Sequence, residues 1–123
     1  MALRCLIVDD NAHFLGAARD LLEREGVTVV DVASTSAEAL HRAAELRPDV
    51  VLVDITLAGE SGFDLARRLD EGGSCDGSAV ILISTHEEAD FADLIAESPA
   101  KAFLPKSELS VDAIRRILDG RSR

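Results

Sequence analysis

Five short apolar runs, each of strand length, constrain the fold of this chain more than any other feature. They read LRCLIV (3–8), VTVVDV (27–32), VVLV (50–53), AVILI (79–83) and KAFL (101–104). Amphipathic stretches of helix length lie between them, with apolar residues at spacings of three and four. Strands that are apolar on both faces are typical of a parallel sheet covered by helices on both sides. The pattern therefore predicts an α/β fold.

We expect a five-stranded, doubly wound, flavodoxin-like sheet with five helices, right-handed crossovers and the strand order 2-1-3-4-5. Three local signals support the helix boundaries. Gly26 is placed as a helix C-terminal glycine, the residues TSAE at 35–38 have the spacing of a capping box, and Ser110 is placed to cap the last helix. The length of 123 residues suits one domain, expected to span residues 1–123.

The composition argues against several classes of protein. The chain has 23 acidic and 13 basic residues, a net charge of −10, which disfavours binding of this chain alone to nucleic acid. It has no twenty-residue apolar span and no cationic, apolar leader, so we expect a cytoplasmic protein without a membrane segment. The two cysteines, Cys5 and Cys75, do not suggest a disulfide framework.

Acidic residues follow two of the predicted strands. Asp9 and Asp10 come after the first strand in LIVDDN, and Asp54 ends the third. In a 2-1-3-4-5 sheet, strands one and three are neighbours at the switch point, so the three carboxylates should converge at the carboxyl edge. Their mutual repulsion is unfavourable unless a hard divalent cation with oxygen ligands neutralises it. Mg²⁺ is the natural candidate.

The remaining strand ends carry a hydroxyl and an ammonium group. The fourth strand leads to Ser84 and the fifth to Lys106. A carboxylate that lies beside a cation, a hydroxyl and an ammonium can receive a phosphoryl group, because the cations neutralise the phosphoryl oxygens. Asp54 would be the nucleophile and would form an acyl phosphate.

With these residues in order at strand ends, the chain resembles the receiver domain of bacterial two-component response regulators over essentially its whole length. The resemblance implies that Asp9 and Asp10 form an acidic pair and that Asp54 is the phosphoacceptor. It further implies that Ser84 is the switch hydroxyl, Phe103 the switch aromatic and Lys106 the phosphate-binding lysine. It also implies that Mg²⁺ is bound by an acidic-pair carboxylate, Asp54 and the backbone carbonyl of Thr56. Thr56 and His86 would gate the access of water to the phosphoryl group.

The function that this resemblance implies is phosphorelay signal transduction. A histidine kinase or histidine phosphotransfer protein would phosphorylate Asp54, and an inward Ser84 with a rotated Phe103 would switch partner binding. Autophosphorylation and slow autophosphatase activity would be the only enzymatic activities. The partner face, or a phosphorylation-dependent homodimer, would use the helix that begins near 86–90, the strand at 101–104 and the helix after Ser110.

The sequence also departs from the family pattern, and it leaves other interpretations open. Ala58 stands where many receivers have proline, and Ser107 follows Lys106 where many have a cis-bonded proline. One alternative is a phosphorylation-independent pseudo-receiver, whose expected sign is the loss of a site residue. Another is a haloacid-dehalogenase-like phosphatase, but such enzymes usually place a second acid where this chain has Thr56. Phe103 read alone could equally be an ordinary core residue, and Asn11 fits a helix cap better than a metal ligand.

Overall fold

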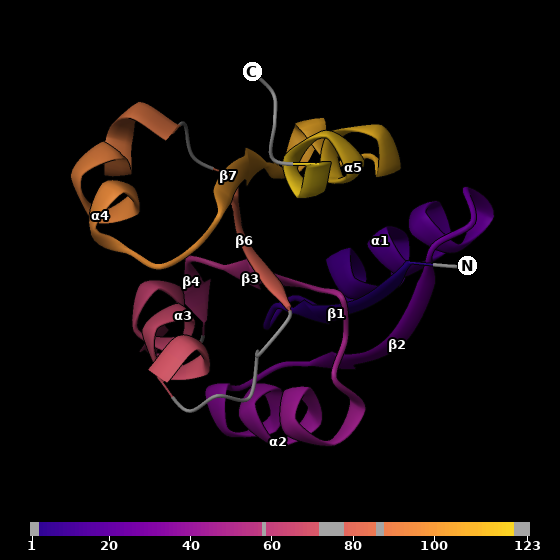
Figure 1. The fold of residues 1–123 in the computed structure, drawn as a ribbon, viewed down its shortest axis with the longest axis horizontal. Helices are drawn as coiled ribbons and strands as arrows, with labels where there is room; N and C mark the ends of the chain where they lie inside the picture. Colours follow the sequence, from indigo (N-terminus) through magenta and orange to yellow (C-terminus); the bar gives the residue numbers. More distant parts are fainter. Residues whose placement is uncertain (1–2, 58, 72–77, 86–87, 120–123) are drawn as a thin grey trace.

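A five-stranded parallel sheet forms the centre of the molecule (Figure 1). The computed structural model describes residues 3–57, 59–71, 78–85 and 88–119. In spatial order the strands are β2 (Thr28–Ala33), β1 (Arg4–Val8), β3 (Val50–Asp54), β6 (Ala79–Ser84) and β7 (Ala102–Pro105). The predicted order 2-1-3-4-5 is confirmed, because β6 and β7 are the fourth and fifth strands of this sheet. A separate antiparallel hairpin of β4 (Thr56–Leu57) and β5 (Glu60–Ser61) was not predicted from the sequence.

Five α-helices cover the two faces of the sheet, as the sequence predicts. They are α1 (Ala12–Arg24), α2 (Ser36–Leu46), α3 (Gly62–Glu71), α4 (Ala92–Glu97) and α5 (Val111–Asp119). Short 3₁₀ helices precede α4 and α5, namely η1 (Glu88–Phe91) and η2 (Lys106–Glu108). The helix predicted to begin within 86–90 thus starts as a 3₁₀ turn, and residues 86 and 87 lie outside the described part of the chain. No described helix has the length and apolarity needed to cross a membrane.

The sheet separates two hydrophobic cores. Side chains on one face pack with α2 and α3 and with partly buried residues of η1 and α4, and those on the other face pack with α1 and α5. We call these the α2–α3 core and the α1–α5 core. The adjacent residues Phe103 and Leu104 on β7 belong to opposite cores. Because both faces are buried, the central strands read as continuous apolar runs rather than alternating ones.

Side-chain caps fix where three helices begin. The N–H groups of Phe14, Glu38 and Ala113 donate to the side-chain oxygens of Asn11, Thr35 and Ser110, each at 3.1 Å. The predicted capping box at α2 is shifted by one residue, since the Glu38 carboxylate accepts from the N–H of Ser34, at 2.9 Å, rather than from that of Thr35. Gly26 follows α1 with a φ of 98°, a left-handed conformation that glycine adopts readily.

Candidate functional site

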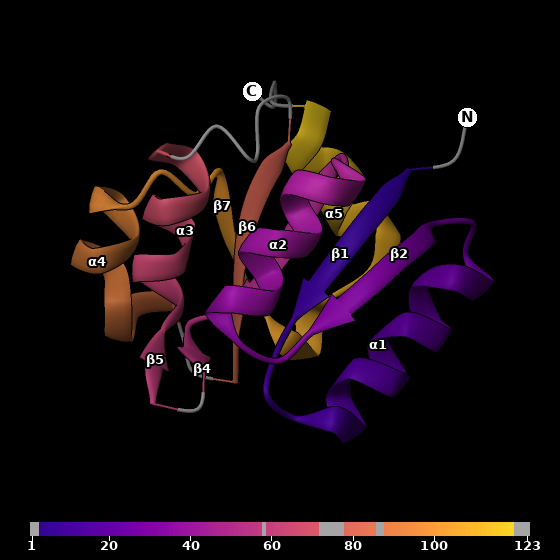
Figure 2. The same cartoon turned by 90° about the horizontal axis from the view of Figure 1, so that it is seen from below.

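Three carboxylates meet where β1 and β3 end. Asp9 and Asp10 follow β1, Asp54 is the last residue of β3, and one carboxylate oxygen of each lies within 4.8 Å of the others. Asp9 is completely buried, Asp54 is 7% exposed and Asp10 is exposed. The β4–β5 hairpin lies at the same edge of the sheet (Figure 2). Neighbouring parallel strands thus bring together residues that are 45 positions apart in the chain.

Hydrogen bonds orient the two buried carboxylates. The N–H of Asn11 donates to Asp9 Oδ1 at 2.9 Å, and the N–H of Thr56 donates to Asp54 Oδ1 at 3.2 Å. Each bond closes a tight turn directly after a strand. Both contacts use an Oδ1 atom, so the Oδ2 atom of each carboxylate is available to other groups.

Lys106 supplies a positive charge to both Oδ2 atoms. Its Nζ lies 2.6 Å from Asp9 Oδ2 and 3.4 Å from Asp54 Oδ2, and its side chain is only 13% exposed. The first contact is an ion pair without hydrogen-bond alignment, and no described residue donates a hydrogen bond to the buried Asp9 Oδ2. Lys106 is the first residue of η2, directly after β7.

The site as a whole disfavours negative charge on Asp54. Burial raises the pKa of the Asp54 carboxyl above its usual value, and the neighbouring Asp9 raises it further. The hydrogen bond from Thr56 and the ammonium of Lys106 lower this pKa, but they do not reverse the direction. The ammonium of Lys106 contacts two of the three carboxylates, those of Asp9 and Asp54, so negative charge at this edge is incompletely compensated.

The donor set fits a hard divalent cation. Carboxylate oxygens are the ligands that Mg²⁺ and Ca²⁺ prefer, and Asp9, Asp10 and Asp54 offer three of them within one small volume. The buried Asp9 Oδ2, which lacks a hydrogen bond, is an oxygen for which a cation would be a suitable partner.

The other residues singled out in the sequence lie around this edge in different environments. Ser84 ends β6, next to β3, and is buried. Phe103 is buried in the α2–α3 core. Thr56 is exposed at the start of β4, and His86 lies outside the described residues.

Gly62 is a residue of this site that the sequence analysis missed. Its N–H donates to the carbonyl of Ile55 at 2.9 Å, and a methyl group added to it would overlap the backbone carbonyl of Asp54. The first turn of α3 therefore packs directly against the backbone of Asp54, an approach that only glycine permits. A glycine eight positions after Asp54 and next to a predicted helix was the available signal.

The hairpin between Asp54 and Gly62 is also tied to α2. The Glu60 carboxylate accepts a hydrogen bond from the N–H of Ser36, in the first turn of that helix, at 2.9 Å. The segment that follows Asp54 is thus fixed at two points, by Glu60 at α2 and by Gly62 at the Asp54 backbone.

Fold and site together define a class: flavodoxin-like, CheY-like α/β domains with an acidic cluster at the carboxyl edge of the sheet. Residues 5–119 match the model of the response regulator receiver domain family. The chain belongs to this family, whose members are two-component signalling domains.

Curated relatives and solved structures agree with this assignment. The chain is 33% identical to the response regulator GacA of Pseudomonas aeruginosa, over 96% of this chain and 56% of that protein. It is 32% identical to the uncharacterized transcriptional regulatory protein YvfU of Bacillus subtilis, over 97% of this chain and 60% of that protein. The chain thus spans somewhat more than half the length of these relatives.

Two solved structures are similarly close in fold. A two-component response regulator of the LuxR family from Aurantimonas superposes with a TM-score of 0.84 and 29% identity, over 98% of this chain and 88% of that one. A response regulator from Burkholderia pseudomallei superposes with a TM-score of 0.80 and 26% identity, over 94% of this chain and 66% of that one. The latter was solved with a phosphorylated aspartic acid and a calcium ion.

Proposed function

We propose that this receiver domain is phosphorylated on Asp54 by a histidine kinase or histidine phosphotransfer protein in a phosphorelay, and that phosphorylation switches partner binding. The observation that carries the proposal is the pair of Oδ2 atoms of Asp9 and Asp54 that face one mostly buried ammonium, Lys106 Nζ. Membership in the family and the phosphorylated aspartic acid in the Burkholderia structure support it.

In this mechanism Asp54 is the nucleophile, and the residues around it orient it or neutralise charge. An oxygen of Asp54 attacks phosphorus, the phosphorus–nitrogen bond of the donor breaks, and the electron pair leaves with the donor imidazole. The N–H of Thr56 orients the Asp54 carboxylate through Oδ1. Lys106 neutralises phosphoryl oxygens, and the hydroxyl of Ser84 donates to one of them.

A bound Mg²⁺ would supply further charge neutralisation at the phosphoryl oxygens. Asp9, Asp10 and Asp54 would hold it through carboxylate oxygens, together with the backbone carbonyl of Thr56. Thr56 and His86 would control the access of water to the acyl phosphate; this gating role stays a prediction.

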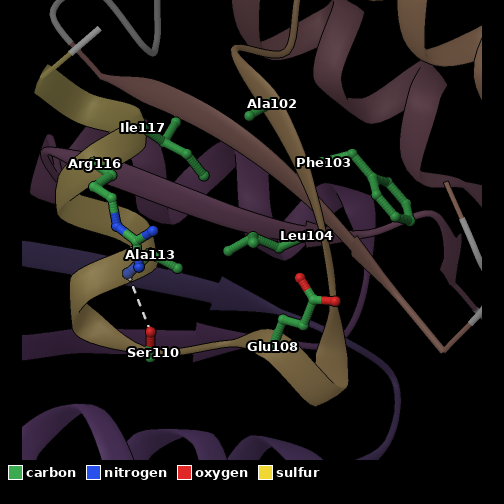
Figure 3. A pocket seen from close by; sticks show the side chains of 8 residues that line it. All are labelled: Ala102, Phe103, Leu104, Glu108, Ser110, Ala113, Arg116 and Ile117. Carbon is green, nitrogen blue, oxygen red and sulfur yellow. Dashed lines mark hydrogen bonds between the residues drawn. The ribbon is translucent and has the colours of Figure 1, made fainter. Parts of the chain in front are cut away.

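The output would pass through Ser84 and Phe103 to the face formed by α4, β7 and α5, which would bind a partner or a second copy of the chain. A pocket of about 530 Å³ opens there between β7 and α5 (Figure 3). Its lining consists of Ala102, Phe103, Leu104, Glu108, Ser110, Ala113, Arg116 and Ile117. In Figure 3 the Phe103 ring and the Leu104 side chain point to opposite sides of the strand, so a rotation of Phe103 would alter this face.

We further propose that residues 1–123 form a single receiver domain that acts in the cytoplasm as a signalling switch rather than a metabolic enzyme. The acidic balance of the chain favours protein partners over nucleic acid or membrane for this domain. Transcription regulation would be an activity of a longer protein, as the name of the Bacillus subtilis relative suggests.

The test is phosphoryl uptake from a small phosphodonor with Mg²⁺, followed by intact-mass spectrometry. We expect one added phosphoryl mass on the parent chain, none on Asp54→Asn, and parental uptake by Asp49→Asn, whose carboxylate lies at the opposite edge of the sheet. Titration should show weaker Mg²⁺ binding by Asp10→Ala, because a ligand or its support is lost. Full labelling of Asp54→Asn would contradict the proposal. Partner binding by an unlabelled parent chain would favour the pseudo-receiver alternative.

A further inference from the structure

The ammonium of Lys106 has a third neighbour besides the two carboxylates. Its Nζ lies 4.2 Å from the centroid of the Phe14 ring, within the range of a cation–π contact. Phe14 is half-buried in α1, close to the start of the helix, and it packs against the α1–α5 core. An aromatic face therefore lies beside a mostly buried positive charge at the acidic edge.

The position of Phe14 is fixed by the same residues that form the site. Asn11 donates its N–H to Asp9 Oδ1, and its side-chain Oδ1 accepts the N–H of Phe14. Lys106 links the two ends of this set, because its Nζ contacts both the Phe14 ring and Asp9 Oδ2. Asp9, Asn11, Phe14 and Lys106 thus form one closed set of contacts, in which moving the ring would move the ammonium.

We propose that Phe14 is a positioning residue for Lys106: its ring holds the ammonium over the Oδ2 atoms of Asp9 and Asp54. A lysine ammonium is strongly hydrated and sits on a flexible four-carbon stem, so ion pairs alone leave it several arrangements near the carboxylates. The ring face attracts the cation while occupying the space that water would take. This role rests on the proposed phosphoryl transfer to Asp54.

The contact itself is tested by NMR on the divalent-free protein. A methylene group beside a ring face is shielded, so the ε-methylene protons of Lys106 should be shifted upfield in the parent chain. Phe14→Leu, which keeps an apolar side chain, should lose this shift, and Phe14→Tyr, which keeps the ring, should retain it. An unshifted Lys106 in the parent chain would overturn the inference.

The function is tested by the rate of phosphoryl uptake from the small phosphodonor. We expect Phe14→Leu to slow uptake about three- to tenfold, the factor that a cation–π contact of ordinary strength provides, and Phe14→Tyr to restore the parental rate. Phe91→Leu is the matched control, since Phe91 is also half-buried but packs against the α2–α3 core. It should keep the parental rate.

The two failures can be told apart. A parent chain that gains no phosphoryl mass refutes the proposed function, and the role of Phe14 in transfer with it. A parent chain that is labelled, with Phe14→Leu labelled equally fast, leaves the proposed function standing and overturns the role of Phe14. Slowing in Phe14→Leu that Phe14→Tyr does not repair points to packing alone and likewise overturns it.

Discussion

The two edges of the sheet differ in how their charged side chains are paired. At the amino-terminal edge, Asp49 Oδ2 accepts the N–H of Arg4 at 2.9 Å, and the Arg4 guanidinium donates to the carbonyl of Arg47 at 2.9 Å. Each of these charged groups binds the backbone and helps to join β1 to the turn before β3. At the carboxyl edge, the carboxylates of Asp9, Asp10 and Asp54 lie close together, and one ammonium, that of Lys106, pairs with Asp9 and Asp54.

This difference distinguishes charges that stabilise the fold from charges that disfavour it. A carboxylate that accepts a backbone hydrogen bond at an exposed edge stabilises the native state modestly. Like charges that are buried together are unfavourable, and such groups commonly occur at functional sites. The carboxyl edge is therefore recognisable by its uncompensated charge, not by the number of its charged residues.

The largest effect on this comparison should come from Gly62→Ala. The added methyl group overlaps the carbonyl of Asp54, so the backbone of the carboxyl edge must shift, and we expect a loss of about 1–3 kcal/mol or more in the free energy of unfolding. Gly16→Ala in α1 is the matched control, because open space surrounds that position and alanine favours a helix by about 0.5–1 kcal/mol. Urea denaturation measures both. Equal stability of Gly62→Ala and the parent chain would show that the Asp54 backbone is not confined.

The next largest effects are expected from substituting one aspartate at each edge of the sheet, Asp49 and Asp54. Asp49→Ala should lower the free energy of unfolding by about 1 kcal/mol, because the N–H of Arg4 loses its acceptor. Asp54→Asn should raise it at neutral pH without divalent ions, because the raised pKa of Asp54 shows that the folded state disfavours its charge. Changes of the same sign in both variants would remove the distinction between the edges.

The pH dependence of Asp54→Asn sharpens this prediction. A carboxyl whose pKa is raised by folding contributes most to the free energy of unfolding below its unfolded-state pKa, about 3.9. This contribution to stability is lost as the pH rises through the folded-state pKa. The advantage of asparagine should therefore be smallest at about pH 4, near the unfolded-state pKa, and should grow as the pH rises. Urea denaturation across this range is the measurement, and a pH-independent advantage would assign it to a cause other than charge.

The smallest effect is expected for Arg4→Ala. Its guanidinium makes one partly solvated hydrogen bond to the carbonyl of Arg47, so the loss should be about 0.5–1 kcal/mol. Phosphoryl uptake should stay at the parental rate, because the residue lies at the far edge of the sheet. Slower uptake by a variant that remains folded would show that the two edges are coupled.

The fold was largely predictable from the sequence because a strand that is buried on both faces of the sheet consists of consecutive apolar residues, which can be recognised in the sequence. The helix ends were predictable where a side chain caps them, as at Asn11 and Ser110, since capping is a local interaction. The β4–β5 hairpin was missed because two-residue strands leave no periodic signal. The start of α4 shifted because propensity over 86–90 does not distinguish a 3₁₀ turn from an α-helix.

The candidate site was predictable only in part, for a related reason. Asp9, Asp54 and Lys106 could be brought together in advance because each lies at the carboxyl end of a strand, and these strand ends share one edge of the sheet. The contacts of Gly62 with the Asp54 backbone and of Phe14 with Lys106 depend on how α3 and α1 approach the sheet. Such distances are set by tertiary packing, which periodicity along the chain does not encode.

The weak anchoring of α4 has a consequence for amide exchange. This helix, Ala92–Glu97, contains no buried residue, Leu94 is 49% exposed, and the neighbouring strand β7 lies at the edge of the sheet. Amides of α4 should therefore exchange with solvent deuterium through local opening, whereas those of β3 should exchange only through global unfolding. A partner that binds the proposed output face would then bind the ordered state of α4 in preference to the opened state, or the reverse. The affinity of that partner would therefore depend on the local folding equilibrium of α4.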